Sequence, residues 1–357
     1  MSSLMALSAT AAERPPVYET FKTPYGNVYG WGSAAQGFVF TDRYSFFGSE
    51  DDAFNYREIS LGGQYEFLDR YSVTLQGEYR DAGESDNLGL RLSQAFVDGY
   101  MSPRPDTILG VNLGRVEIPL GFYNRTRDRV DTRPSIVLPQ SVYLEGLGLR
   151  DILLTGDGGM FYGLHEINKR SRIESKMAMA RSSFVSVDGL EDAWIFSGWT
   201  GYVWDDKLSL RLTLLLSEKD DTKLTFPVLS AQYKSDGWTL TSEWGNLKLD
   251  APFGRVETDG IYGQVEYAVT GNFSLFGRYD YLKFGVDTVV PIEISDDRLR
   301  AQSLAFGFGY DITKHFRLNA EYHLMDGKAY LNDAENPGLD AGPEDWNMLV
   351  IMGSVRF

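Results

Sequence analysis

The chain has 357 residues, of which 34 are Lys or Arg and 50 are Asp or Glu, so that its formal net charge is −16. It contains no cysteine, which excludes a disulfide framework, a thiolate metal site and a cysteine nucleophile. The acidity disfavours a nucleic-acid-binding protein, which needs a basic face, and an aromatic content of 14% with 37 glycines excludes a disordered chain.

The N-terminal residues, MSSLMALSATAA, are predicted to be the remnant of a secretory signal peptide (1–12). They contain a short apolar run followed by Ala9-Thr10-Ala11, a small-residue sequence that is typical of a signal cleavage site. Residues 13–25 are expected to be a lead-in, and residues 26–357 are expected to form the folded part of the chain.

Apolar and polar residues alternate along most of the remaining chain. Between Tyr71 and Arg80 every odd position is apolar, aromatic or Gly and every even position is polar. Because the side chains of a strand point alternately to its two faces, such a segment has one apolar and one polar side. No stretch reaches the roughly 18–20 consecutive apolar residues of a membrane-spanning helix.

Sixteen strands are predicted from this alternation, and it is most ambiguous in the first, fourth and sixth of them. They lie at residues 27–39, 55–67, 71–81, 90–101, 106–117, 157–167, 172–183, 192–204, 207–218, 226–235, 238–249, 257–269, 273–285, 300–312, 316–328 and 345–357.

Short and long connections alternate between these strands. The turns at 68–70, 205–206 and 236–237 are short, whereas the loops at 118–156 and 329–344 are long. This sorting is typical of a barrel that crosses a bilayer, with tight periplasmic turns on one side and long extracellular loops on the other. The predicted fold class is therefore an all-β, 16-stranded antiparallel transmembrane β-barrel formed by residues 26–357.

The third long connection, at about 118–156, combines many charges with apolar residues that could pack against a wall. A structureless loop of this length is usually functional. Its apolar residues include Phe122, Tyr123, Ile136, Val137, Leu138, Tyr143 and Leu144.

The final strand has Leu349, Ile351 and Val355 on one face, and the chain ends on Phe357. A terminal aromatic residue after alternating apolar positions resembles the assembly signal of bacterial outer-membrane barrels. The run GRVEIPLG at 114–121 resembles the Gly-Arg-x-x-x-Pro-x-Gly run of porin-like proteins, which enters their loop 3.

Over residues 26–357 the chain thus resembles Gram-negative porins, and most closely the phosphate-selective-porin-like branch (the porin O and P superfamily). The resemblance implies a homotrimer in which loop 3 folds into each barrel and narrows it. It also implies an integral outer-membrane location, contact with outer-membrane lipid and lipopolysaccharide, and insertion by the barrel-assembly machinery.

A water-filled barrel of this kind would let small hydrophilic solutes and ions diffuse passively, without catalysis, and the width and charge of its constriction would set selectivity. Arg115, at the entrance of loop 3, is the leading constriction candidate. Loop 3 itself adds Arg125, Arg127, Asp128, Arg129, Asp131 and Arg133. The polar strand faces supply lumen-wall candidates of both signs, namely Glu78, Arg80, Arg91, Arg211, Glu243, Glu266, Arg278, Asp280, Arg317 and Glu321.

Charge near the constriction differs from the charge of the whole chain. Residues 121–134 contain four Arg and two Asp, a net charge of +2, whereas residues 326–345 have a net charge of −5. Because screening over about 8–10 Å separates the pore from distant loops at ordinary salt, the constriction favours anions weakly.

Two alternatives stay open. The first is a substrate-specific channel for phosphate, a dicarboxylate or an oligosaccharide. A sugar channel would show a row of aromatic residues on the polar face, which Phe276 and Phe284 alone do not form, and a phosphate channel would show a ladder of Arg and Lys, whereas the wall candidates alternate in sign. The second alternative is a structural or secretion barrel without an open pore.

The sequence predicts no enzyme, no cofactor, no metal site and no nucleic-acid partner. The three histidines, His165, His315 and His323, are scattered along the chain. A barrel enzyme would instead need a histidine paired with Ser or Asp at the rim.

Overall fold

The computed structural model describes residues 19–47, 54, 56–83, 89–124, 127, 129–130, 132–145, 155–181, 190, 192–288, 294–333, 335–339 and 342–357. The predicted signal remnant (1–12) lies outside the described residues. Three of the predicted loop-3 residues, Arg125, Asp128 and Asp131, also lie outside them.

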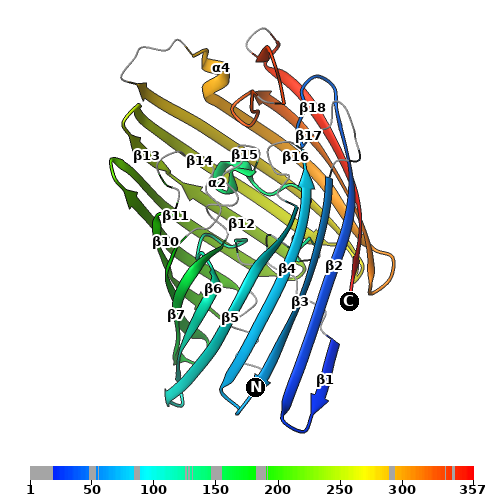
Figure 1. Cartoon of the computed structure of the whole chain (residues 1–357). Helices are drawn as coiled ribbons and strands as arrows, with labels where there is room; N and C mark the ends of the chain where they lie inside the picture. The colour runs from blue at the N-terminus through cyan, green and yellow to red at the C-terminus, as the bar shows by residue number, and fades with distance from the viewer. Residues whose placement is uncertain are drawn as a thin grey trace.

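The described chain is almost entirely antiparallel sheet, and most strands pair with their neighbours in sequence (Figure 1). The strands are β1 (Glu19–Thr23), β2 (Gly26–Thr41), β3 (Tyr56–Phe67), β4 (Tyr71–Ala82), β5 (Gly89–Arg104), β6 (Thr107–Glu117), β7 (Thr155–Asn168), β8 (Ser171–Arg181), β9 (Trp194–Trp204), β10 (Leu208–Lys219), β11 (Thr222–Ser235), β12 (Trp238–Gly245), β13 (Lys248–Ala251), β14 (Gly254–Ala268), β15 (Phe273–Thr288), β16 (Arg300–Asp311), β17 (Phe316–Gly327) and β18 (Asp345–Arg356).

These elements form a closed barrel of sixteen wall strands, as predicted. β12 and β13 are two parts of one wall strand, because both pair with β11 on one side and with β14 on the other. The pairing of β18 with β2 closes the barrel. Closure leaves no exposed sheet edge around the wall, which is the condition for a sheet to cross a bilayer.

β1 lies within the segment expected as a lead-in and pairs with the first residues of β2. Just above it, the backbone N–H of Phe357 donates to the Gly32 carbonyl at 3.0 Å, and the Gly32 N–H donates to the Phe357 carbonyl at 2.9 Å. β1 therefore pairs with the same edge of β2 as β18 does, so the first and last strands of the chain meet there (Figure 1).

The alternation of burial along the strands confirms which side of the wall faces outward. On β10, Leu210 and Leu212 are 45% and 57% exposed, whereas Arg211 and Thr213 between them are buried. Apolar positions thus cover the outside of the barrel, and the polar positions point into a lumen filled by other residues.

The connections are sorted between the two ends of the barrel. Seven short turns between described wall strands lie at one end. One of them is the two-residue turn Asp236-Gly237, where both residues have positive φ, as a tight hairpin requires. The other end carries the long loops, but two of its connections are also short, at Asp220-Asp221 and Pro252-Phe253. Neither described helix, α2 (Gln140–Tyr143) or α4 (Asp296–Leu299), is long and apolar enough to span a membrane.

Candidate functional site

Loop 3, between β6 and β7, turns into the barrel instead of projecting from its rim. All of its described residues from Ile118 to Glu145 are buried, and α2 lies within the barrel (Figure 1). The apolar side chains predicted to pack against the wall are buried there, with Ile136 and Tyr143 at most 1% exposed. The loop therefore forms the constriction level of the lumen.

Glu243 on β12 is one anchor of this loop. Its carboxylate accepts hydrogen bonds from the Phe122 N–H at 2.9 Å and from the Tyr143 hydroxyl at 2.7 Å. Two wall hydroxyls, Ser230 at 2.6 Å and Tyr262 at 2.7 Å, hold the same carboxylate in place. Burial, reinforced by the charge of Glu243, raises the pKa of the Tyr143 hydroxyl well above its usual value, so that this hydroxyl stays a donor.

A second anchor lies on β15 and β17. The Asp280 carboxylate accepts from the backbone N–H groups of Gln140 and Ser141, at 2.6 and 3.2 Å, which have no acceptor within the first turn of α2. The Arg278 guanidinium donates to the Val137 carbonyl at 2.9 Å. Glu321 accepts from the N–H groups of Ile136 and Val137.

Arg211 on β10 holds the beginning of the loop. It donates to the Gly121 carbonyl at 2.5 Å, and its guanidinium lies 4.8 Å from the ring centre of Phe122 and 3.8 Å from that of Trp199. Gly121 has φ +53°, and an added Cβ would lie 2.4 Å from the Tyr143 hydroxyl, so glycine is required at this turn.

On the opposite wall a cluster of five buried charges joins loop 3 to β3 and β4. Glu58 bonds to both Arg80 and Arg133. Glu145 lies 3.8 Å from Arg80 and 3.5 Å from Arg127. None of these side chains is more than 4% exposed, so each charge depends on its partners inside the protein.

The structure places the predicted lumen-wall residues on the lumen side, where several of them hold loop 3. Arg80, Arg211, Glu243, Arg278, Asp280 and Glu321 all contact the loop. Glu78 and Arg91 pair with each other, Glu266 is half-buried and accepts from Gln264, and Arg317 bonds to Asp311.

The prediction that Arg115 lies at the constriction is wrong. Arg115 shares the outward side of β6 with Leu113, which is 59% exposed, and makes a bidentate ion pair with Asp157 on β7 at 2.8 and 2.7 Å. Because Arg115 is two residues from Leu113 along the strand, it cannot point into the lumen.

The loop-3 arginines also differ from their predicted role. Arg127 and Arg133 are at most 1% exposed and are paired with Glu145 and Glu58. Arg129 instead extends over the Trp31 ring, 5.7 Å from its centre, and reaches a lumen cavity. Glu58 was not predicted as a site residue, although the alternation along its strand places it on the polar face, with Ser60.

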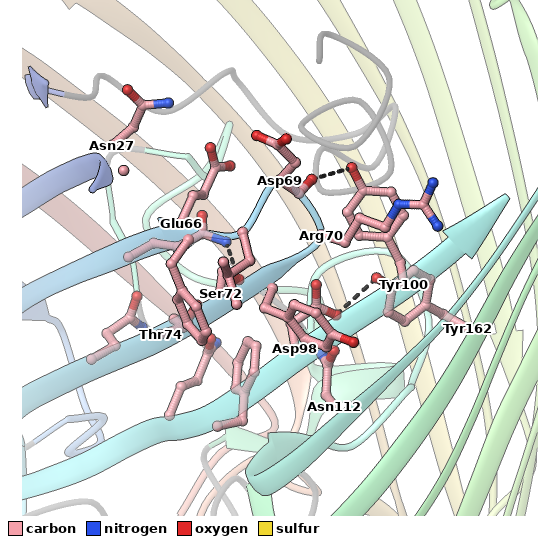
Figure 2. Close-up of a pocket in the computed structure, with 18 of the residues that line it drawn as sticks. Asn27, Glu66, Asp69, Arg70, Ser72, Thr74, Asp98, Tyr100, Asn112 and Tyr162 are labelled. Atoms are coloured by element: carbon pink, nitrogen blue, oxygen red, sulfur yellow. Dashed lines mark hydrogen bonds between the residues drawn. The ribbon is translucent and has the colours of Figure 1, made fainter. Parts of the chain in front are cut away.

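Below loop 3 lies a cavity of about 460 Å³ along the inner side of β2 to β8. Its lining extends from the short turns, at Tyr25 and Arg70, to Arg129 of loop 3, and Figure 2 shows part of it. Polar and aromatic side chains project into it, including Glu66, Asp98 and Tyr162.

One substitution tests the seat of α2. An added Cβ at Gly260 on β14 would lie 2.2 Å from the Ser141 carbonyl oxygen, a backbone atom that cannot swing aside. Gly260→Val is therefore expected to push α2 off the wall, measured as faster proteolysis of loop 3 and altered channel conductance. Gly263→Val on the same strand is the control, because its Cβ position has nothing within 4 Å; equal proteolysis of both variants would contradict the expectation.

Comparison with known proteins gives the family. The family model described as the outer membrane protein beta-barrel domain matches residues 168–351, more than half of the chain. The chain belongs to this family and is an integral protein of the outer membrane. The short turns are accordingly the periplasmic end of the barrel. A comparison with curated proteins finds no match.

Solved structures share the barrel fold at low sequence identity. Salmonella typhi OmpF in complex with daunomycin is 11% identical with a TM-score of 0.65, covering 95% of this chain and 100% of that one. OmpT of Vibrio cholerae is 13% identical with a TM-score of 0.60, at 95% and 100% coverage. The anion-selective porin from Comamonas acidovorans is 13% identical with a TM-score of 0.58, at 96% and 100% coverage.

Proposed function

We propose that the protein is a porin that lets small hydrophilic solutes and ions diffuse through the outer membrane, with a weak preference for anions. The observation that carries the proposal is loop 3, which is held inside the lumen by buried polar contacts with wall strands on opposite sides of the barrel. A loop that many buried hydrogen bonds hold at one place in the lumen would set a fixed width for a channel, which a purely structural barrel does not need.

The preference for anions has modest support. Among the described residues, buried Arg and Lys side chains outnumber buried Asp and Glu side chains. Arg129 reaches the cavity below loop 3, where a passing solute would meet it, and Arg127 and Arg133 lie in the buried charge cluster with Glu145 and Glu58. The similarity to a porin named as anion-selective agrees with this direction.

Planar-bilayer recording under a KCl gradient tests the proposal. The refolded protein is expected to give stable conductance steps and a reversal potential of the sign that chloride selectivity produces. Arg129→Gln should shift that potential toward cation selectivity, because it removes the described loop-3 cation at the cavity. A correctly folded barrel without conductance would overturn the porin proposal, and a cation-selective native channel would overturn the anion preference.

The assembly inferred from the resemblance remains part of the proposal. A homotrimer is supported by the ion pair of Arg115 and Asp157 on the outer face, since charges on a lipid-facing surface are unfavourable and a protein contact would shield them. One solved structure of the Vibrio cholerae OmpT is described as a trimer. Lipopolysaccharide contact, insertion by the barrel-assembly machinery and a signal remnant at 1–12 belong to the same proposal.

The substrate-specific alternative is tested in the same recordings. Phosphate or a dicarboxylate that blocks the current at low concentration would favour the narrower resemblance to phosphate-selective porins. An enzymatic role has little support: His323 is 1% exposed and lies 3.2 Å from Glu321, whose carboxylate is already bonded to two N–H groups of loop 3. His323 thereby belongs to the anchor of the loop.

A further inference from the structure

A single row of polar side chains crosses the wall of the cavity below loop 3. Its members are register partners on five consecutive strands, from β2 to β6. They are Asn27, Glu66, Ser72, Asp98 and Asn112 (Figure 2). Because neighbouring strands lie about 4.8 Å apart, the row offers hydrogen-bonding groups at regular short steps around the inner wall.

Aromatic side chains border this row on both sides. Tyr100 and Gly110 lie two residues nearer the periplasm than Asp98 and Asn112 on the same strands. Gly110 pairs with Tyr100 on one side and with Tyr162 on the other. The Tyr162 ring lies across Gly110, where an added Cβ would be 2.1 Å from the ring, so one face of the ring rests on the wall. On the other side of the row, Phe96 and Tyr29 occupy the equivalent positions.

Several polar atoms of the row have no partner among the described residues. Asn112 is 7% exposed, and its side-chain oxygen accepts no hydrogen bond. Asp98 accepts from the Tyr162 hydroxyl through one oxygen, at 2.8 Å, and Glu66 accepts from the Tyr29 hydroxyl through one oxygen, at 3.0 Å. A buried amide oxygen without a partner is unfavourable, and all of these atoms are acceptors, so the row suits a ligand that donates several hydrogen bonds.

The charges of the cavity nearly cancel. Lys176 is paired with Glu117, and the adjacent rim residues Asp69 and Arg70 carry opposite charges. The other charged residues that line the cavity are the two carboxylates of the row, Glu66 and Asp98, and Arg129. The volume of about 460 Å³ lies within the range of about 300–1,000 Å³ that is usual for small-molecule sites.

We propose that this cavity binds a neutral saccharide of one or two rings. Sugar hydroxyls donate to carboxylates and exchange hydrogen bonds with amides, as the row requires, and the C–H face of a sugar ring can rest on Tyr162. An anion bound at the row would be repelled by Glu66 and Asp98, even if an anion in transit is favoured by Arg129 at the top of the cavity, and an amine would leave Asn27, Ser72 and Asn112 without a role. The inference rests on the proposed porin function, because it gives the channel a preferred class of solute.

The test uses maltose as the neutral probe, added on the periplasmic side of single channels in a planar bilayer. Reversible interruptions of the ion current are expected, with a half-saturating concentration that rises about tenfold in Tyr162→Ala and in Asn112→Ala. Tyr162→Phe keeps the ring and should retain most of the block. Phe276→Ala is the matched control, since Phe276 also lies over a glycine, Gly307, but on β15, outside the cavity.

Calorimetric titration of the detergent-solubilised barrel with maltose separates the two proposals. Heat of binding that is lost in Tyr162→Ala supports the saccharide site even if no variant conducts, an outcome that would overturn the porin proposal alone. Open channels that bind neither maltose nor sucrose would overturn the saccharide site alone. Block by spermidine that Asp98→Asn abolishes, without any effect of sugar, would also overturn it and make the site a cation site.

Discussion

Replacing Glu243 by alanine is expected to release the start and the end of loop 3 from the wall. The carboxylate is shared by the Phe122 N–H and the Tyr143 hydroxyl of the loop and by two wall hydroxyls. The Phe122 N–H also donates to the Tyr143 hydroxyl at 3.0 Å, so the main loss for the closed loop is the acceptor of that hydroxyl, which costs about 1–3 kcal/mol for a buried donor. We expect a larger and noisier single-channel conductance and faster entry of solutes that the native channel excludes.

The control for this variant is Glu174→Ala. Glu174 is also a carboxylate on the lumen side, but its described partner is Arg172 near the periplasmic end. Glu174→Ala should therefore leave the single-channel conductance close to the native value. Glu243→Gln keeps an acceptor at the same place and should lie between the two. If Glu243→Ala left both conductance and the exclusion limit unchanged, loop 3 would not depend on this anchor.

The wall of the barrel could be predicted from the sequence because alternation is a local signal. From Tyr71 to Arg80 on β4 and from Leu208 to Leu214 on β10, the lumen positions are polar and the outer positions are apolar or Gly, so the period of two indicates both the strand and its orientation. β1 escaped prediction because it is only five residues long, and it is defined by its pairing with β2 and its place below Phe357.

The cavity could not be predicted for a physical reason. Trp31, Phe96, Tyr100 and Tyr162 of its lining lie on β2, β5 and β7, the three strands with ambiguous alternation. β5 contains a bulge at Ser93, which moves the lumen side from odd positions, such as Arg91, to even positions, such as Phe96 and Asp98. A bulge reverses the faces of everything after it, so counting by two loses the orientation at that point.

The role of the wall charges in holding loop 3 could not be predicted from the sequence either. A pattern shows that Arg278 and Asp280 face the lumen, but not whether water or loop 3 occupies the space before them. The loop approaches these residues from more than a hundred positions away in the chain, and its contacts are mostly made by backbone groups such as the Val137 carbonyl, which carry no sequence signature. The prediction for Arg115 was wrong because it followed the position of this residue in the run 114–121. The alternation along β6 places Arg115 on the same outward face as Leu113.

Replacing Glu58 by alanine is expected to have the largest effect on stability. It would leave Arg80 and Arg133 buried without the carboxylate that both of them share, although Arg80 keeps Glu145. Removing one partner of a buried ion pair costs about 3–5 kcal/mol. The measurement is the temperature at which the barrel loses its compact migration in detergent gels, which should fall markedly or leave no folded species after refolding.

The double variant Glu58→Gln with Arg133→Met tests whether the lower transition temperature of Glu58→Ala comes from an unpaired charge or from lost side-chain packing. If an unpaired charge is the cause, removing the second charge should restore much of the transition temperature that Glu58→Ala loses, because a buried pair can often be replaced by uncharged groups of similar volume. Glu257→Ala, which breaks an exposed pair with Lys248, should leave the transition unchanged. A double variant no more stable than Glu58→Ala would show that packing around Tyr56, and not the charge of Arg133, depends on Glu58.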